Sequence, residues 1–71
     1  MASVRIACNR RNPQKMEYLG TLPVDTEGHI ARDLDLPAPV YDALEAAMAR
    51  GDNEGTLYVD RDICYRWFVD R

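Results

Sequence analysis

The stretch PAPVYDALEAAMARG, residues 37–51, decides the fold class, because it is predicted to form one helix placed between two groups of strands. Its apolar residues recur at the spacing of one helical face: Val40, Leu44, Ala47 and Met48. Two prolines stand where a helix begins, since proline is tolerated in the first turn. Gly51 directly after Arg50 is typical of a left-handed cap. We therefore predict a helix that starts at Val40 and ends at Arg50.

Before the helix, alternation of apolar and polar residues over Ser3–Cys8 predicts a half-buried strand. A second alternation starts at Met16 and puts Tyr18 on the same face as Leu22, with Pro23 as the expected end of that strand. A glycine within this run, at position 20, indicates a bulge.

After the helix, the patterns predict a hairpin of strands at Thr56–Val59 and 63–70, with Trp67 on the core side and Phe68 on the other. Residues 29–36 fit a further short strand only in part. The order of elements predicts an α+β domain: an antiparallel sheet of four to five strands with one α-helix packed on one face.

The composition allows a single small domain over residues 1–71, with 9 basic and 12 acidic residues and 46% apolar residues. No stretch approaches the roughly 20 apolar residues that cross a bilayer. The two cysteines, Cys8 and Cys64, are fewer than small disulfide-dependent secreted folds carry. We therefore expect no membrane contact, a cytoplasmic location and free thiols, although one bridge between neighbouring strands stays open.

The sequence contains no residue pattern that is typical of catalysis or of cofactor binding. Ser3 is the sole serine and His29 the sole histidine, and the histidine falls in a predicted turn, so no nucleophile–base pair can be argued. The four glycines form no phosphate-binding motif, and two cysteines with one histidine cannot complete a four-ligand zinc site. We expect no enzyme, no cofactor and no metal site.

Charge is strongly segregated along the chain. Residues 25–62 hold ten acidic and three basic residues, whereas residues 1–24 hold four basic and one acidic. Acidic surfaces accelerate association with basic partners by long-range steering, although a solvated acidic face also simply keeps a small protein soluble. The candidate partner-binding residues are Asp33, Asp35, Asp42, Glu45, Asp52, Glu54, Asp60 and Asp62.

In size and charge class the chain resembles the small inhibitors that phages and mobile elements make against host machinery, including anti-CRISPR proteins and polymerase inhibitors. This resemblance implies a non-enzymatic DNA mimic. Its partner would be a basic host protein or ribonucleoprotein complex, bound on its nucleic-acid-binding surface, with no direct contact between this chain and nucleic acid.

The alternative is that the chain itself binds nucleic acid, as a small dimeric DNA-binding antitoxin or transcriptional regulator. Four basic residues gather around the first turn: Arg5, Arg10, Arg11 and Lys15. Tyr18 follows Lys15 by three residues and offers an aromatic ring on which a base could stack. Residues 28–51 distantly resemble the swapped-hairpin antitoxin pattern but lack its basic residues. Exposed aromatic residues around Tyr58 and Phe68 offer a further contact surface, and an accessory role in a larger assembly is a third possibility.

Overall fold

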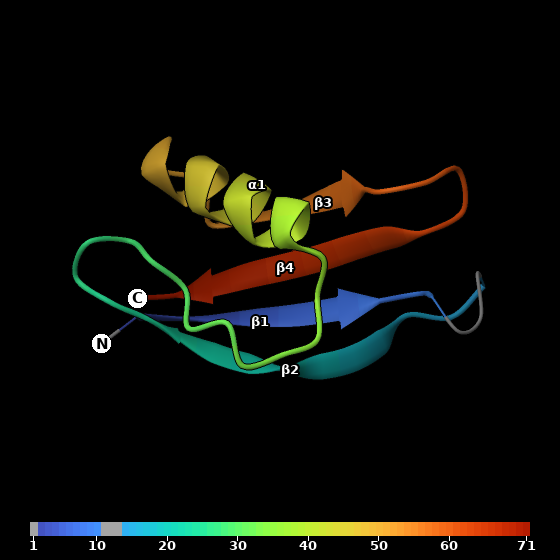
Figure 1. The fold of residues 1–71 in the computed structure, drawn as a ribbon, viewed down its shortest axis with the longest axis horizontal. Coiled ribbons are helices and arrows are strands. Elements are labelled where there is room, and N and C mark those ends of the chain that lie inside the picture. Colours follow the sequence, from blue (N-terminus) through green and yellow to red (C-terminus); the bar gives the residue numbers. More distant parts are fainter. Residues whose placement is uncertain (1, 11–13) are drawn as a thin grey trace.

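Four antiparallel strands and one helix make up the protein, which confirms the predicted α+β class (Figure 1). The computed structural model describes residues 2–10 and 14–71. Its elements are β1 (Ala2–Cys8), β2 (Glu17–Val24), α1 (Ala38–Ala49), β3 (Glu54–Tyr58) and β4 (Cys64–Asp70). The strand order is β2-β1-β4-β3, so the first and last strands of the chain pair at the centre of the sheet.

The two central strands carry the alternation that the sequence predicts. Val4 and Ile6 on β1 are fully buried, and Trp67 on β4 is 4% exposed, whereas its neighbour Phe68 is 41% exposed. These buried side chains share one hydrophobic cluster with five residues of the helix: Val40, Tyr41, Leu44, Ala47 and Met48. Alternate residues of the strands therefore face either the core or the outside, as expected for a half-buried sheet.

β2 departs from the prediction in two ways. The strand continues through Pro23 to Val24, because β2 lies at the edge of the sheet, where a residue without an N–H is tolerated. The predicted irregularity at Gly20 is present: Ile6 pairs with Gly20 but Ala7 pairs with Tyr18, so one residue is inserted. This bulge reverses the faces, and the assignment of Tyr18 to the face of Leu22 was wrong: Tyr18 is 65% exposed and Leu22 is buried.

The helix begins at Ala38, two residues before the predicted start, and Pro39 is accommodated in its first turn. It ends as predicted with a glycine in a left-handed conformation, since φ of Gly51 is +95°. The amide of Gly51 donates to the carbonyl of Met48 and that of Asp52 to the carbonyl of Ala47. This arrangement satisfies two of the carbonyl groups that a helix end leaves free.

The remaining differences concern boundaries and the connection before the helix. β3 runs over Glu54–Tyr58 rather than 56–59. Residues 29–36 form no strand and contribute a single bridge, between Val24 and Ile30. They reach the helix through Tyr41, whose hydroxyl donates to the Leu34 carbonyl (2.6 Å) and accepts from the Leu34 amide (3.1 Å).

The two thiols are free, with Cys8 buried and Cys64 half-buried. Cys8 pairs with Tyr65. Cys64 precedes Tyr65 in β4, so strand alternation directs its side chain toward the opposite face of the sheet. No helix among the described residues has the length and apolar character that crossing a membrane requires.

Candidate functional site

The acidic residues that the sequence singles out are dispersed over several elements. Asp33 and Asp35 lie in the connection before α1, and Asp42 and Glu45 lie on α1. The other four stand at opposite ends of β3: Asp52 and Glu54 at its start, Asp60 and Asp62 beyond its end. All are exposed except Glu45, which is half-buried. The eight residues therefore lie on several elements rather than on one.

Basic side chains stand among these carboxylates. Arg50 lies 3.2 Å from Asp52, and Arg10 donates to the backbone carbonyl of Asp35 at 3.4 Å. Arg11, another member of the predicted basic cluster, lies outside the described residues. The contact of Arg10 with Asp35 brings the basic N-terminal part against the acidic stretch, whereas Arg50 and Asp52 are already neighbours in sequence.

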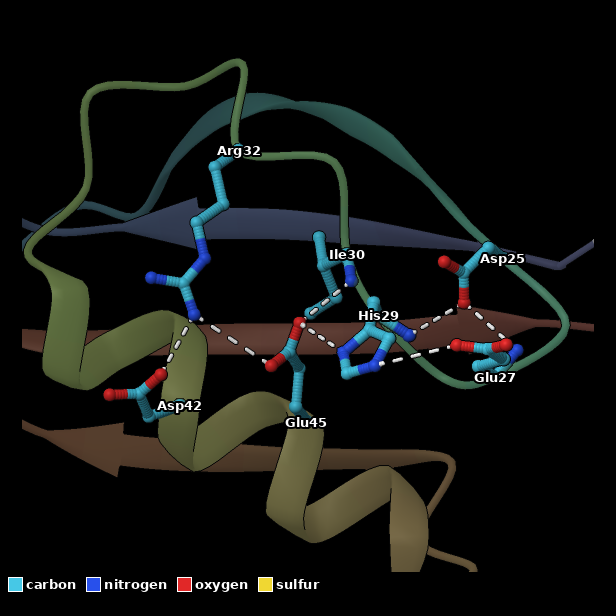
Figure 2. Close-up of polar contacts among 7 residues, drawn as sticks. All are labelled: Asp25, Glu27, His29, Ile30, Arg32, Asp42 and Glu45. Atoms are coloured by element: carbon cyan, nitrogen blue, oxygen red, sulfur yellow. Dashed lines mark hydrogen bonds and ion pairs between the residues drawn. The ribbon is translucent and has the colours of Figure 1, made fainter.

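Glu45 and Asp42 take part in a polar cluster that joins the 25–36 connection to α1 (Figure 2). Glu45 accepts a hydrogen bond from the Ile30 amide at 2.8 Å, and its side chain is only 21% exposed. Arg32 lies 2.7 Å from Asp42 and 3.7 Å from Glu45, and the hydrogen bond to Asp42 is the main reason why the pKa of Arg32 is raised. Glu45 is thus half-buried rather than exposed like the other candidate partner-binding residues, because it follows the buried Tyr41 by one helical turn.

The turn that leads into this cluster is fixed by Asp25. Its carboxylate accepts from the amides of Glu27 and His29, each at 2.9 Å. The bond from the His29 amide is the main reason why the pKa of Asp25 is lowered, since it stabilises the charged form. His29 itself lies between Glu27 and Glu45, at 3.9 and 3.8 Å (Figure 2). These contacts hold the connection against the helix, and we assign them a structural role.

Aromatic and basic side chains gather instead on the sheet face that points away from the core. The sheet register brings Arg5 beside Phe68 and Ala7 between Tyr18 and Arg66. We call this surface the aromatic–basic face and define it by Arg5, Tyr18, Tyr58, Arg66 and Phe68. All five residues are exposed, the tyrosines at 65% and 69%.

Contacts within the sheet orient two of these side chains. The hydroxyl groups of Tyr18 and Thr21, neighbours on β2, are hydrogen-bonded to each other. Arg5 lies 3.0 Å from the Asp70 carboxylate and 5.7 Å from the centre of the Phe68 ring. This last distance is within the range of a cation–π contact. The face is therefore partly ordered before any partner arrives.

Two hollows open on this face and share Arg66. The first, of about 180 Å³, is bordered by the rings of Tyr18 and Phe68, with Arg5, Ala7 and Arg66 beside them. Ala7 has the smallest side chain of the five, which leaves space between the two rings.

The second hollow, of about 470 Å³, lies where the turn after β1 meets the β3–β4 hairpin. The described residues that line it include Lys15, Arg61, Arg66, Tyr58 and one acidic residue, Asp62. Among the described residues, the two hollows together are bordered by four basic side chains and one acidic one. The lining of the two hollows is thus basic on a chain whose net charge is −3, while Asp70 and Glu54 lie on the same face of the sheet outside the hollows.

Asn9 holds the second hollow together. It is 7% exposed, its side-chain amide donates to the Asp62 carbonyl at 2.8 Å, and its side-chain oxygen accepts from the Cys64 amide at 2.9 Å. These bonds tie the end of β1 to the far hairpin. The sequence indicates Asn9 only as a turn residue, because a hydrogen bond across more than fifty positions leaves no local pattern.

Among the described residues, 2–10 and 14–71, no group of three or more His, Cys, Asp or Glu is arranged to hold a metal ion. Comparison with known proteins found no matching family model, no matching curated protein and no matching solved structure. The functional argument therefore rests on the geometry of the aromatic–basic face.

Proposed function

We propose that this protein is a non-enzymatic binding protein that binds single-stranded nucleic acid on its aromatic–basic face. The observation that supports the proposal is the placement of three exposed aromatic rings and two arginines on one face of four paired strands. Exposed rings on a sheet offer stacking surfaces to unpaired bases, and interspersed cations bind the phosphates between them.

Single strands fit this face better than a duplex does. The bases of a duplex are stacked on each other, so their flat surfaces are hidden from protein rings, whereas a single strand can turn its bases outward. Stacking of one base on an aromatic side chain contributes about 1–3 kcal/mol. Two or three such contacts would give measurable affinity without a deep pocket.

The negative net charge of the chain sets a limit on this binding. Carboxylates elsewhere on the surface repel the phosphate backbone, and the repulsion extends about 10 Å at 0.1 M salt. We therefore expect moderate affinity that depends on close contact with the face. The dispersed carboxylates would also discourage other orientations of the strand.

The test is fluorescence anisotropy with labelled eight-nucleotide single strands of DNA and RNA, and with a duplex of the same sequence. Phe68→Ala should weaken single-strand binding about tenfold, because each 1.4 kcal/mol of stacking free energy is a factor of ten. Val59→Ala, which removes an exposed apolar side chain outside both hollows, is the matched control and should change little. Absence of single-strand binding, or tighter duplex binding, would refute the proposal.

A second candidate function is inhibition of a basic host protein or ribonucleoprotein by the acidic residues. It is favoured by Asp33, Asp35 and Asp60, which are exposed and form no ion pair with any described basic side chain. Their reversal to Lys should then slow association with that partner by an order of magnitude or more, since electrostatic steering changes on-rates by roughly 10–10³. The variant Arg5→Glu with Lys15→Glu should leave that association rate nearly unchanged.

The same two sets of variants separate the two functions. If nucleic acid is the ligand, reversal of Arg5 and Lys15 abolishes binding and reversal of the three carboxylates strengthens it. Surface plasmon resonance on both sets, with circular dichroism to confirm folding, measures which set carries the effect.

A further inference from the structure

We infer that the two hollows together bind two consecutive nucleotides of a single strand, each hollow contacting a different part. This inference rests on the proposed binding of single-stranded nucleic acid. One base lies in the first hollow, between Tyr18 and Phe68. The phosphate that follows lies at the mouth of the second hollow, beside Arg66. The next base stacks on Tyr58.

The first hollow suits a flat, unpaired base. Two aromatic rings border it, and Ala7, between the strands that carry them, raises no side chain into the space. Adjacent strands lie about 4.8 Å apart, so Tyr18 and Arg66, one strand to either side of Ala7, stand roughly 10 Å apart at the backbone. Such a gap leaves room for a planar group over Ala7.

The second hollow suits an anion. Lys15, Arg61 and Arg66 reach it from the first turn, the second hairpin and β4, and Asp62 is the one carboxylate among the described residues that line it. Three basic residues and one acidic residue give this lining a net positive charge, which attracts an anion. Asn9 fixes the hairpin in this position through its bonds to Asp62 and Cys64.

Arg66 and Tyr58 make the two hollows one site. Arg66 borders both, so its guanidinium can contact a phosphate attached to the base in the first hollow. Tyr58 is 69% exposed at the second hollow and offers the next stacking surface. Two stacking surfaces on either side of a cation match a strand, with one phosphate between two bases, better than a free nucleotide.

The experiment uses fluorescein-labelled octathymidylate and octauridylate, titrated with the full chain between 50 and 200 mM salt. Ala7→Leu fills the first hollow and should weaken binding about tenfold or more, the effect of preventing one base from stacking. Ser3→Leu adds the same side chain to the same face of β1 outside both hollows, and should change affinity less than about twofold. Tyr18→Ala tests the same hollow on an edge strand if Ala7→Leu does not fold.

Arg66→Ala tests whether Arg66 contacts a phosphate of the bound strand. The slope of log Kd against log salt for a single strand changes by about 0.7 for each phosphate that the protein no longer neutralises. We expect that decrease for Arg66→Ala and none for Arg32→Ala, whose guanidinium is bound to Asp42 away from this face.

Three results would overturn the inference while leaving the proposed function in place. These are unchanged affinity in Ala7→Leu and Tyr18→Ala, an unchanged salt slope in Arg66→Ala, and competition by thymidine monophosphate at the concentration at which octathymidylate competes. Absence of any binding by the wild-type chain would instead refute the proposed function and the inference together.

Discussion

Substitution of Gly55 by alanine tests how closely β3 packs on the core. Gly55 pairs with Trp67, and a Cβ atom built at Gly55 would lie 2.9 Å from the indole Cζ2 and 3.1 Å from Nε1. Such distances are shorter than van der Waals contact. The indole cannot simply move aside, because Trp67 is buried and packed among the other residues of the core cluster. Glycine at this position is therefore required by the space that the indole occupies.

The expected loss is a large part of the total stability. A chain of 71 residues has a free energy of unfolding of roughly 4–11 kcal/mol, at about 0.05–0.15 kcal/mol per residue. Insertion of a methyl group into a packed core costs about 1–3 kcal/mol, and the lower entropy of the unfolded alanine chain offsets about 0.4–1 kcal/mol. We expect Gly55→Ala to lose about 1–2 kcal/mol, or roughly 4–16 °C in Tm for a domain of this size.

A double-mutant cycle with Trp67→Phe checks the cause. Phenylalanine lacks the indole Cζ2 and Nε1 atoms, so the added methyl group at position 55 would have space. Urea unfolding of the four proteins should give a coupling free energy of about 1–2 kcal/mol, with Gly55→Ala nearly neutral in the Trp67→Phe background. If Gly55→Ala is equally destabilising in both backgrounds, the packing argument is incorrect.

Two further predictions concern the polar cluster at the helix. Glu45→Ala should lower the free energy of unfolding by about 1–3 kcal/mol and speed hydrogen exchange of the Ile30 amide, because that half-buried donor loses its acceptor. Asp42→Ala removes an exposed ion pair and should lower the free energy of unfolding by at most about 1 kcal/mol. The pKa of Asp25 lies below its ordinary 3.8, so its contribution to stability is present above that pH and is lost as the pH falls through the lowered pKa. Asp25→Asn keeps an acceptor but does not titrate, so its stability should fall less than that of the wild type between pH 4 and pH 2 in denaturant unfolding; equal losses in the two proteins would show that Asp25 is not the group responsible.

The elements with a strong local pattern could be predicted from the sequence. Alternation over Ser3–Cys8 and over 63–69 identified the two central strands and their buried faces, because a strand with one face in the core must alternate. The helix and its cap at Gly51 could also be predicted from the sequence. These features depend only on neighbours within a few residues.

The candidate site depends on contacts between distant residues, which local sequence patterns do not encode. Exposure of Tyr18 follows from a bulge whose position is set by the pairing of Ile6 with Gly20, fourteen positions away. The placement of Arg66 beside Ala7 depends on the register between the first and last strands. Charge is segregated along the sequence, but folding places Arg10, from the basic N-terminal part, beside Asp35 of the acidic stretch.

The exposed rings on the outer face of the sheet are the feature that solubility alone does not explain. Thr21, Thr56 and Asp70 on that face are residues that a solvated strand would carry, whereas exposure of Phe68 and two tyrosines costs free energy in water. A domain with 12 acidic residues has ample means of staying soluble. The rings stand beside cations and around two hollows. That combination favours a ligand in which flat rings alternate with anionic groups, as bases alternate with phosphates along an unpaired nucleic-acid strand.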